Sequence, residues 1–379
     1  MKVAFLSSFY PYTGEIPIGN AMLYRVIERS NEIKAFNFSL LYPELIYPGK
    51  EKLVDAASND DIIQSQRLLN TINPASYYST AQAINTFNPN VLITRYWLPY
   101  LGASIGGTAK FIDKNIKKIA IVDSMRTKNS IIFEEKLNKL FVDNYDAFIV
   151  LNQQSKEDLL SIKSNAFCVE HSRPFFTAFG DKVEQHIAKK ILNIPLDKKI
   201  LLFYGELRHY KGVETIFKTL AELDDSYHLL IAGTSVSNFE YENRKINNLG
   251  IENKITIINH NPGGNEIPYI FAASDLLLLI LERELPQEII SNSFSFELPV
   301  ITTNIGKYKE YFDKFGIIIE SVDSKLLKNA INKYFDENMK KYFQSNLDEI
   351  RYNRSWESLA TIIYDIYEKL KETEDYTIF

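Results

Sequence analysis

The sequence predicts an α/β protein made of two doubly wound domains, each a parallel β-sheet with helices on both faces. Three observations lead to this prediction. The chain has 379 residues, which at roughly 100–200 residues per domain indicates two domains. Short apolar segments alternate with helical segments through both halves, a rhythm typical of parallel sheets that are covered on both faces. A polar stretch at 171–181 separates the two runs and marks the domain boundary.

In the first run, an apolar strand at 2–7 is followed by a loop through Gly14 to Gly19. A helix is expected from about Asn20 to Asn31. Further strands are predicted at 91–95, 118–123 and 147–151, each followed by helical or loop sequence.

The second run repeats the pattern more clearly. Strands are predicted at 199–204, 228–233, 254–259, 276–281, 300–303 and 316–320. Helices are predicted between them at 213–223, 238–249, 267–273, 288–296 and 324–334. The last segment, 355–370, reads as one long amphipathic helix with a single apolar stripe.

Composition excludes several classes of protein. A formal net charge of -5 argues against nucleic-acid binding, which needs a strongly basic face. The single cysteine, Cys168, excludes a disulfide within the chain and fits a reducing cytoplasm. No segment approaches the ~20 apolar residues of a membrane span, so we expect a cytoplasmic protein that at most sits on the inner face of a membrane. Lys110, Lys114, Lys117 and Lys118 could meet anionic lipid, although a solvated helix face explains them as well.

The strongest chemical signal follows the strand at 199–204. A glycine turn at Gly205 leads through Arg208 and Lys211 to a helix that starts near Gly212. Both basic residues therefore lie at the carboxyl end of a strand, where a planar guanidinium and a point ammonium charge suit a diphosphate. The alternative is that both are ordinary solvated loop charges.

A second signal follows the strand at 276–281. Pro286 suits the first position of a helix, so the backbone N–H groups of Glu288 to Ile290 would face the same crevice and favour an anion. Glu284 precedes the helix, and Asn292 lies about one turn into it. The simpler interpretation is that the two glutamates only complement the helix dipole.

Other chemistries find no support in the sequence. The five histidines are scattered without an i, i+4 pair, so no metal site is predicted. No Gly-x-Ser-x-Gly elbow of a serine hydrolase occurs. The first strand is not followed by the Gly-x-Gly-x-x-Gly turn of dinucleotide-binding oxidoreductases.

The order of motifs resembles the GT-B glycosyltransferases of the large retaining family four, the glycosyl transferases group 1. The segment 203–212 is similar to that family's diphosphate motif, 270–275 to its segment before the donor-site strand, and 299–306 to the strand and turn after the donor helix. The segment 355–357 resembles the start of the final helix, which in the family crosses back to the N-terminal domain. The resemblance therefore implies an N-terminal domain at 1–177 joined by 356–379, and a nucleotide-sugar-binding domain at 178–355.

The N-terminal half is similar to a bacterial subgroup of the family. The segment 13–25 resembles its glycine loop and first helix, and 38–49 and 72–74 resemble further parts. Two positions depart from the pattern, because Gly14-Glu15 stands where the family has Gly-Gly, and Asp123-Ser124 stands where the subgroup has His-Asn. In the C-terminal half, the family's Glu-x7-Glu motif falls on Glu284 and Asn292, and Glu288 takes the place of a glycine.

The resemblance implies retaining transfer of a sugar from a nucleoside diphosphate sugar to a hydroxyl of a glycan or lipid-linked acceptor, without metal or other cofactor. Arg208 and Lys211 would stabilise the leaving diphosphate, with help from the N–H groups of Ile289 and Ile290. Glu284 would hold hydroxyls of the donor sugar.

Three further roles complete the expected site. Asn292 would contact the ribose, Gly14 would let the first loop approach the diphosphate, and Glu15 and Glu288 would lie beside it. Asp123 would bind the donor sugar or take the acceptor proton, unless it only caps a following helix. The alternatives are a GT-B-fold binding or regulatory partner with a decayed donor site, and a nucleotide-sugar epimerase.

Overall fold

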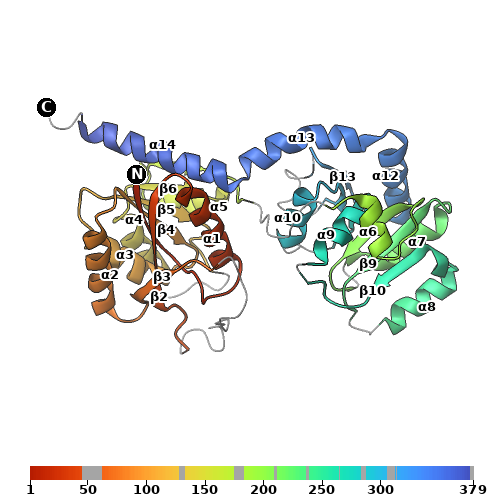
Figure 1. Cartoon of the computed structure of the whole chain (residues 1–379), viewed down its shortest axis with the longest axis horizontal. Helices are drawn as coiled ribbons and strands as arrows, with labels where there is room; N and C mark the ends of the chain where they lie inside the picture. Colours follow the sequence, from red (N-terminus) through yellow and green to blue (C-terminus); the bar gives the residue numbers. More distant parts are fainter. Residues whose placement is uncertain are drawn as a thin grey trace. The chain divides into compact units, whose positions relative to one another are not determined.

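The computed structural model confirms an α/β fold with two parallel sheets (Figure 1). It describes residues 1–44, 62–127, 133–174, 183–208, 211–235, 239–263, 265–282, 287–304, 312 and 314–375, without the side chains of 287, 288 and 373–375. The chain divides into two compact units, an N-terminal unit of Met1–Pro174 with Tyr352–Phe379 and a C-terminal unit of Phe175–Arg351. The boundaries expected from the sequence were 177/178 and 355/356.

The N-terminal unit holds a seven-stranded sheet in the order β3-β2-β1-β4-β5-β6-β7, with every pair parallel. Its strands are β1 (Lys2–Leu6), β2 (Glu32–Leu40), β3 (Ser65–Asn70), β4 (Val91–Tyr96), β5 (Lys117–Val122), β6 (Ala147–Val150) and β7 (Cys168–Glu170). Its helices are α1 (Glu15–Glu28), α2 (Pro74–Phe87), α3 (Leu101–Ala109), α4 (Glu134–Val142), α5 (Gln153–Ile162) and α14 (Trp356–Asp375).

The C-terminal unit holds a six-stranded parallel sheet in the order β10-β9-β8-β11-β12-β13. Its strands are β8 (Lys199–Tyr204), β9 (Tyr227–Ala232), β10 (Ile255–Ile258), β11 (Leu276–Leu279), β12 (Val300–Thr303) and β13 (Gly316–Ile319). Its helices are α6 (Gln185–Ile191), α7 (Val213–Glu222), α8 (Glu240–Leu249), α9 (Ile267–Ala273), α10 (Gln287–Ser295), α12 (Ser324–Asp336) and α13 (Met339–Asn353), with a 3-10 turn at Glu252–Lys254.

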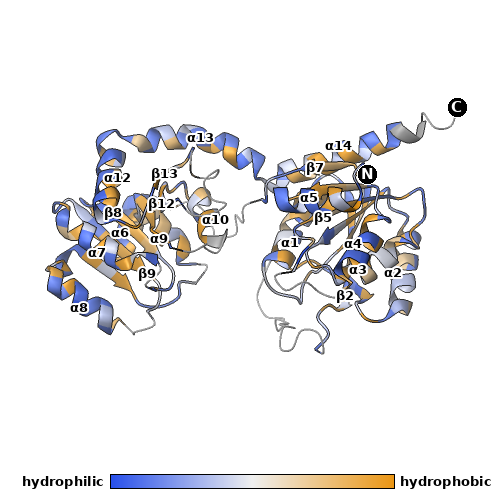
Figure 2. Cartoon of the chain, turned by 180° about the vertical axis from the view of Figure 1, so that it is seen from behind, coloured by the Kyte–Doolittle hydropathy of each residue, from blue (hydrophilic) through white to orange (hydrophobic). Residues whose placement is uncertain are grey.

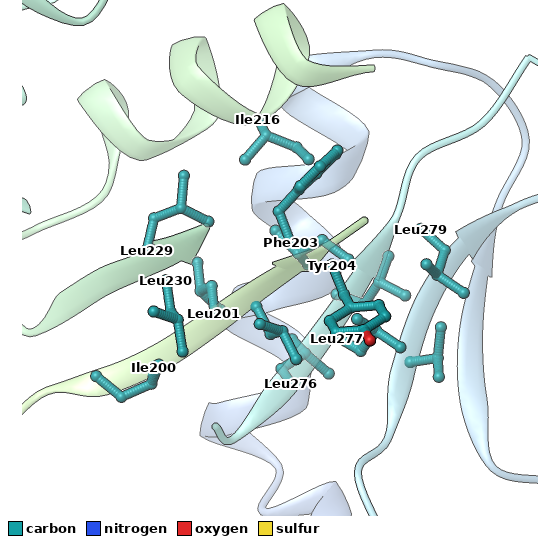
Figure 3. Close-up of a cluster of buried hydrophobic side chains, with 14 of the residues drawn as sticks. Ile200, Leu201, Phe203, Tyr204, Ile216, Leu229, Leu230, Leu276, Leu277 and Leu279 are labelled. Carbon is teal, nitrogen blue, oxygen red and sulfur yellow. The ribbon is translucent and has the colours of Figure 1, made fainter. Parts of the chain in front are cut away.

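The apolar runs form strands because both faces of each sheet are covered. All six residues of β4 and of β9 are buried, as expected for strands of a parallel sheet that is covered on both faces. In the C-terminal unit, Leu201 of β8 packs among apolar side chains of β9, β11 and α7 (Figure 3). Figure 2 shows the complementary pattern, with predominantly polar residues along the outer helices α8 and α13.

Each sheet has a point where the strand order reverses. In the N-terminal unit this switch point lies between β1 and β4, and in the C-terminal unit between β8 and β11. The loops on either side of a switch point leave in opposite directions, so open α/β sheets bind ligands outside the carboxyl ends of these strands. The residues after β1, β4, β8 and β11 are therefore the expected lining of a ligand site in each unit.

The first helix corrects the sequence-based expectation of 20–31, because α1 begins at Glu15. Gly14 ends the preceding loop with φ of 108°, a conformation that side chains rarely adopt. Gly19 consequently lies inside the helix rather than in the loop. A Cβ there would lie 2.7 Å from both the Arg95 guanidinium and the Trp356 indole, so tertiary packing explains this glycine.

The final helix α14 packs on the N-terminal unit, as the resemblance implied (Figure 1). Its contacts with that unit include the ion pair Arg29–Glu357 and the hydrogen bonds Asn31–Tyr364 and His171–Ser358. Among the described residues, no helix combines the length and the apolar character needed to cross a bilayer. Several elements are absent from the predicted pattern, including β2, β3, α2 and α13.

Candidate functional site

The loop after β8 begins at the switch point of the C-terminal sheet. β8 ends at Tyr204, and Gly205 follows with φ of 96°. The Gly205 N–H donates to the carbonyl oxygen of Ala232 at 2.8 Å, which fixes the loop to the end of β9. Gly233 has no room for a side chain, because a Cβ there would lie 2.2 Å from the Gly205 carbonyl oxygen. Two glycines thus let the backbones of neighbouring loops touch.

A tight turn then leads into α7. The Lys211 N–H donates to the carbonyl oxygen of Arg208 at 2.9 Å, and Gly212 is the N-cap of α7 with φ of 64°. A Cβ on Gly212 would lie 2.4 Å from the carbonyl oxygen of Ile280, directly after β11. The turn therefore presses against the second strand of the switch point and brings Lys211 there.

Lys211 carries the buried charge of this region. The residue is 8% exposed, and its ammonium lies 6.0 Å from the centre of the Phe203 ring. Burial lowers the pKa of Lys211, while Glu206 acts in the opposite direction. No ion pair or hydrogen bond joins this ammonium to a carboxylate within the described ranges. A buried cation without a carboxylate partner favours the binding of an anion.

Arg208 has a different environment. Its side chain is 46% exposed, and its Nε donates to Glu206 Oε2 at 2.7 Å. Arg208 is thus a partly exposed loop residue that pairs with Glu206, whereas Lys211 is buried. The contact with Glu206 uses one of the five N–H donors of the guanidinium, so it does not by itself exclude a contact with a diphosphate.

The first turn of α10 lies beside the glycine loop. Ile289 and Ile290 are buried, and the Ile289 side chain would contact a Cβ on Gly205 at 3.8 Å. Two predicted regions of the donor site are thereby brought together. Glu284 lies outside the described residues, as does the side chain of Glu288.

Asn292 is fully buried on α10. Among the described residues, neither its Oδ1 nor its Nδ2 has a hydrogen-bond partner, and the Ser291 hydroxyl has none either. A buried, unsatisfied polar group costs about 1–3 kcal/mol, so this amide is unusual in the core. The predicted ribose contact stays a prediction, because in this structure the side chain is covered.

The second region lies in the N-terminal unit and is centred on Asp123, directly after β5. Its carboxylate accepts two hydrogen bonds from Arg95 of β4, from Nε at 2.6 Å and from Nη2 at 2.9 Å. Arg173, after β7, places Nη2 2.8 Å from the same carboxylate. Burial raises the pKa of Asp123, but Arg95 and Arg173 outweigh that effect, so its pKa lies below the ordinary value. A carboxylate held this way is a poor acceptor for a substrate proton.

The helix-capping interpretation of Asp123 is wrong. The next helix, α4, begins at Glu134, with Phe133 as its N-cap. The Asp123 carbonyl oxygen instead accepts hydrogen bonds from Asn152 and Ser155 at the start of α5. Asp123 thus links β4, the segment after β7 and the start of α5.

The side of this cluster toward α1 is also tightly built. Asn20 donates to the Ser7 hydroxyl and to the Ser8 carbonyl oxygen, each at 2.8 Å, and accepts from Arg95 at 3.4 Å. Glu15, in the first turn of α1, places its carboxylate 3.5 Å from Arg173. Its described partner is therefore an arginine of its own unit.

Sequence reasoning missed Arg95, Arg173 and Asn20. The available signal was Arg95 itself, the only charged residue of the otherwise apolar strand β4 and 2% exposed. Buried arginines are rare unless paired, so Arg95 indicated that a carboxylate lies next to it in the fold.

The four lysines considered for contact with lipid, at 110, 114, 117 and 118, do not all lie on the surface. Lys117 is buried and Lys118 pairs with Asp146 at 3.7 Å, whereas Lys110 and Lys114 are exposed.

Metal ligands do not gather in the part of the chain that the structure describes. No group of three or more His, Cys, Asp or Glu side chains lies close enough there to hold an ion. Independence from metals stays a prediction.

Comparison with known proteins agrees with the fold. Residues 184–353 match the family model described as glycosyl transferases group 1. The D-inositol 3-phosphate glycosyltransferase of Corynebacterium jeikeium (strain K411) is 23% identical over 266 residues, which cover 65% of this chain and 62% of that protein. The match thus spans less than two thirds of that relative's length.

Two solved structures match almost the whole chain. A glycosyltransferase from Rickettsia africae ESF-5 gives a TM-score of 0.65 at 19% identity and covers 97% of this chain and 98% of that one. Anabaena Alr3699/HepE, solved in complex with UDP, gives 0.59 at 13% identity and covers 97% and 100%. The expected GT-B fold is confirmed.

Proposed function

We propose that this chain is a member of the glycosyl transferases group 1, whose family model residues 184–353 match, and that it transfers a hexose from a nucleoside diphosphate sugar with retention of configuration. The acceptor is a hydroxyl of a glycan or a lipid-linked molecule. The bond from the anomeric carbon to the diphosphate oxygen breaks, and a bond from that carbon to the acceptor oxygen forms. The acceptor proton leaves on the diphosphate or to water.

The buried ammonium of Lys211 is the observation that carries this proposal. It lies at the switch point of the C-terminal sheet, 8% exposed, between two glycines with positive φ. A diphosphate brings negative charge to an ammonium that pairs with no carboxylate among the described residues, and that charge grows as the bond to the sugar breaks. Lys211 therefore stabilises the leaving group more than the bound donor, which is what acceleration requires.

The other predicted residues have supporting roles in the proposal. Arg208 contacts the diphosphate when the donor binds. The first turn of α10, with Ile289 and Ile290, adds N–H groups and the positive end of a helix dipole. Glu284 for the sugar hydroxyls and Asn292 for the ribose rest on the family resemblance alone.

Nucleotide binding tests the proposal directly. The thermal unfolding midpoint is measured with UDP, GDP, UDP-glucose and GDP-glucose for the wild type, Lys211→Met and Lys218→Met. Lys218 is the matched control, since it is an exposed lysine on α7. Loss of one charge-assisted contact is worth about 1.5–3 kcal/mol, so Lys211→Met should weaken binding roughly 10–150-fold, while Lys218→Met leaves it unchanged. If none of the four nucleotides raises the midpoint of the wild type, the proposal fails.

A GT-B-fold binding or regulatory partner is the second candidate. It is favoured by the pairing of Arg208 with Glu206 and by the complete burial of Asn292. Release of UDP from UDP-glucose separates the two functions. Slow hydrolysis that Lys211→Met abolishes supports the transferase, whereas tight binding without any hydrolysis or transfer supports the binding protein. Conversion of the free nucleotide sugar into an epimer would instead indicate an epimerase.

A further inference from the structure

The guanidinium of Arg173 lies between two carboxylates that hold it very differently. Its Nη2 is 2.8 Å from Asp123 Oδ1, in the buried interior of the cluster. Its Nη1 is 3.5 Å from Glu15 Oε2, and the Glu15 side chain is 52% exposed. The Arg173 side chain is 23% exposed, so one edge of the guanidinium is buried and the other is accessible to small ions.

The buried part of this cluster carries an excess of positive charge. Arg95 and Asp123 form a bidentate pair in which both side chains are 3% exposed. One carboxylate cannot neutralise two guanidiniums, so the addition of Arg173 leaves one positive charge. Among the described residues, only the carboxylate of Glu15 faces that charge from outside. A long, exposed ion pair of this kind contributes little.

The position of the cluster suits a ligand. Arg95 and Asp123 belong to the carboxyl ends of β4 and β5, next to the switch point between β1 and β4. The Asp123 contact fixes one edge of the Arg173 guanidinium, so the fork is oriented before any ligand arrives. An oriented arginine fork recognises the two oxygens of a phosphate or a carboxylate through parallel hydrogen bonds.

We propose that Arg173 binds an anionic group, a phosphate monoester or a carboxylate, on the acceptor, and that Glu15 occupies this position while the acceptor is absent. Glu15 then acts as an internal competitor, and Asp123 is a positioning residue that orients Arg173. The inference rests on the proposed function, since it names the class of acceptor that the transferase would use. Neutral sugars lack the charge that displaces Glu15 and bind poorly.

Calorimetric titration with three small probes tests the inference: glucose 6-phosphate, glucuronate and glucose. The wild type should bind the two anions and not glucose, and the stronger of the anions identifies the group. Arg173→Gln should weaken the binding of the preferred anion by at least about tenfold, the loss expected for a charge-assisted contact. Arg173→Lys, which keeps the charge but not the fork, should give an intermediate loss.

Glu15→Gln should tighten binding several-fold, because the competing carboxylate is gone. A gain of affinity cannot arise from misfolding, so this variant protects the test against a destabilised Arg173 variant. Arg25→Gln, which removes an exposed arginine of α1 from its pair with Glu28, is the matched control and should change nothing. Equal affinity in the wild type and Arg173→Gln, or weaker binding in Glu15→Gln, overturns the inference.

Lys211→Met separates this inference from the proposed function. It should leave the binding of glucose 6-phosphate and glucuronate unchanged while it weakens the binding of UDP. Anion binding that depends on Lys211 and not on Arg173 would locate the probes in the C-terminal unit and overturn the inference, with the transferase proposal intact. Anion binding that depends on Arg173, without any binding of nucleotides, would instead support the anion site and contradict the proposed transferase function.

Discussion

Replacing Asp123 by Asn tests how the charged cluster of the N-terminal unit is held together. The change removes one negative charge and leaves Arg95, whose side chain is 3% exposed, without its buried partner. Loss of one partner from a buried ion pair costs about 3–5 kcal/mol. Asparagine keeps one oxygen that can accept from Arg95, so we expect the lower end, about 3 kcal/mol. For a unit of this size that corresponds to a fall in the unfolding midpoint of roughly 6–12 °C.

Tryptophan fluorescence measures this unfolding selectively. The chain has 2 tryptophans, and both Trp97 and Trp356 are buried in the N-terminal unit. A thermal or guanidinium transition followed by their emission therefore reports on that unit, which avoids treating the whole chain as two-state. The matched control is Asp143→Asn, since the Lys139–Asp143 pair on the same unit is exposed and should be worth about 0.3–0.5 kcal/mol.

The pH dependence adds a second check on Asp123. Its pKa is lowered in the folded state, so its contribution to stability is complete above the ordinary aspartate pKa and is lost as the pH falls through the lowered value. The difference between the wild type and Asp123→Asn should therefore be constant near neutral pH and shrink under acid conditions. The reasoning is refuted if Asp123→Asn destabilises the unit no more than Asp143→Asn does at neutral pH.

Two further predictions concern stability. Burial lowers the pKa of His171 to about 4, so the folded state binds this proton more weakly than the unfolded state does. The free energy of unfolding should therefore fall by up to ~3 kcal/mol as the pH falls from 6.5 to 4. In His171→Gln this part of the pH dependence disappears from the tryptophan transition, although Gln can still bond to Ser358; an unchanged pH profile would contradict it. Gly233→Ala should cost more than ~3 kcal/mol, because its Cβ would clash with the Gly205 backbone, whereas Gly250→Ala meets no atom within 4 Å and costs only about 1–2 kcal/mol for its positive φ. Circular dichroism melting should show the loss for Gly233→Ala, and equal midpoints for the two alanine variants would rule out the steric argument.

Buried strands and the glycine loop could be predicted because their causes are local. The segment 199–204 matches β8 residue for residue, because after Lys199 it is an unbroken apolar run, as expected for a strand covered on both faces. Gly205 was recognised as a turn residue and Gly212 as the start of a helix, and both have positive φ. The start of α1 was misplaced because Gly19 looked like part of a loop. A glycine is needed at position 19 because Trp356 packs against it, and Trp356 lies near the other end of the sequence.

The cluster around Asp123 could not be predicted because its members, too, are far apart in the sequence. Its partners come from β4, from the segment after β7 and from the first turn of α1, and only the sheet order brings them together. Asp123 was recognised as a strand-end carboxylate, but nothing in its neighbourhood along the chain reveals two arginines. The environment of Lys211 was easier to predict, because the strand, the turn and the helix around it follow one another in the sequence.

The two switch points differ in charge among the described residues, and this difference supports a different proposed ligand for each unit. The C-terminal unit presents Lys211 without a carboxylate partner among the described residues, whereas the N-terminal cluster already contains the carboxylates of Asp123 and Glu15. A phosphate charge about 5 Å from either carboxylate would be repelled by ~3 kcal/mol at an effective dielectric constant near 20. A diphosphate, with at least two charges, gains more from the C-terminal unit. A single anionic group that replaces Glu15 on Arg173 avoids the repulsion from Glu15, because it takes the place of a charge already there, while Arg95 balances the charge of Asp123.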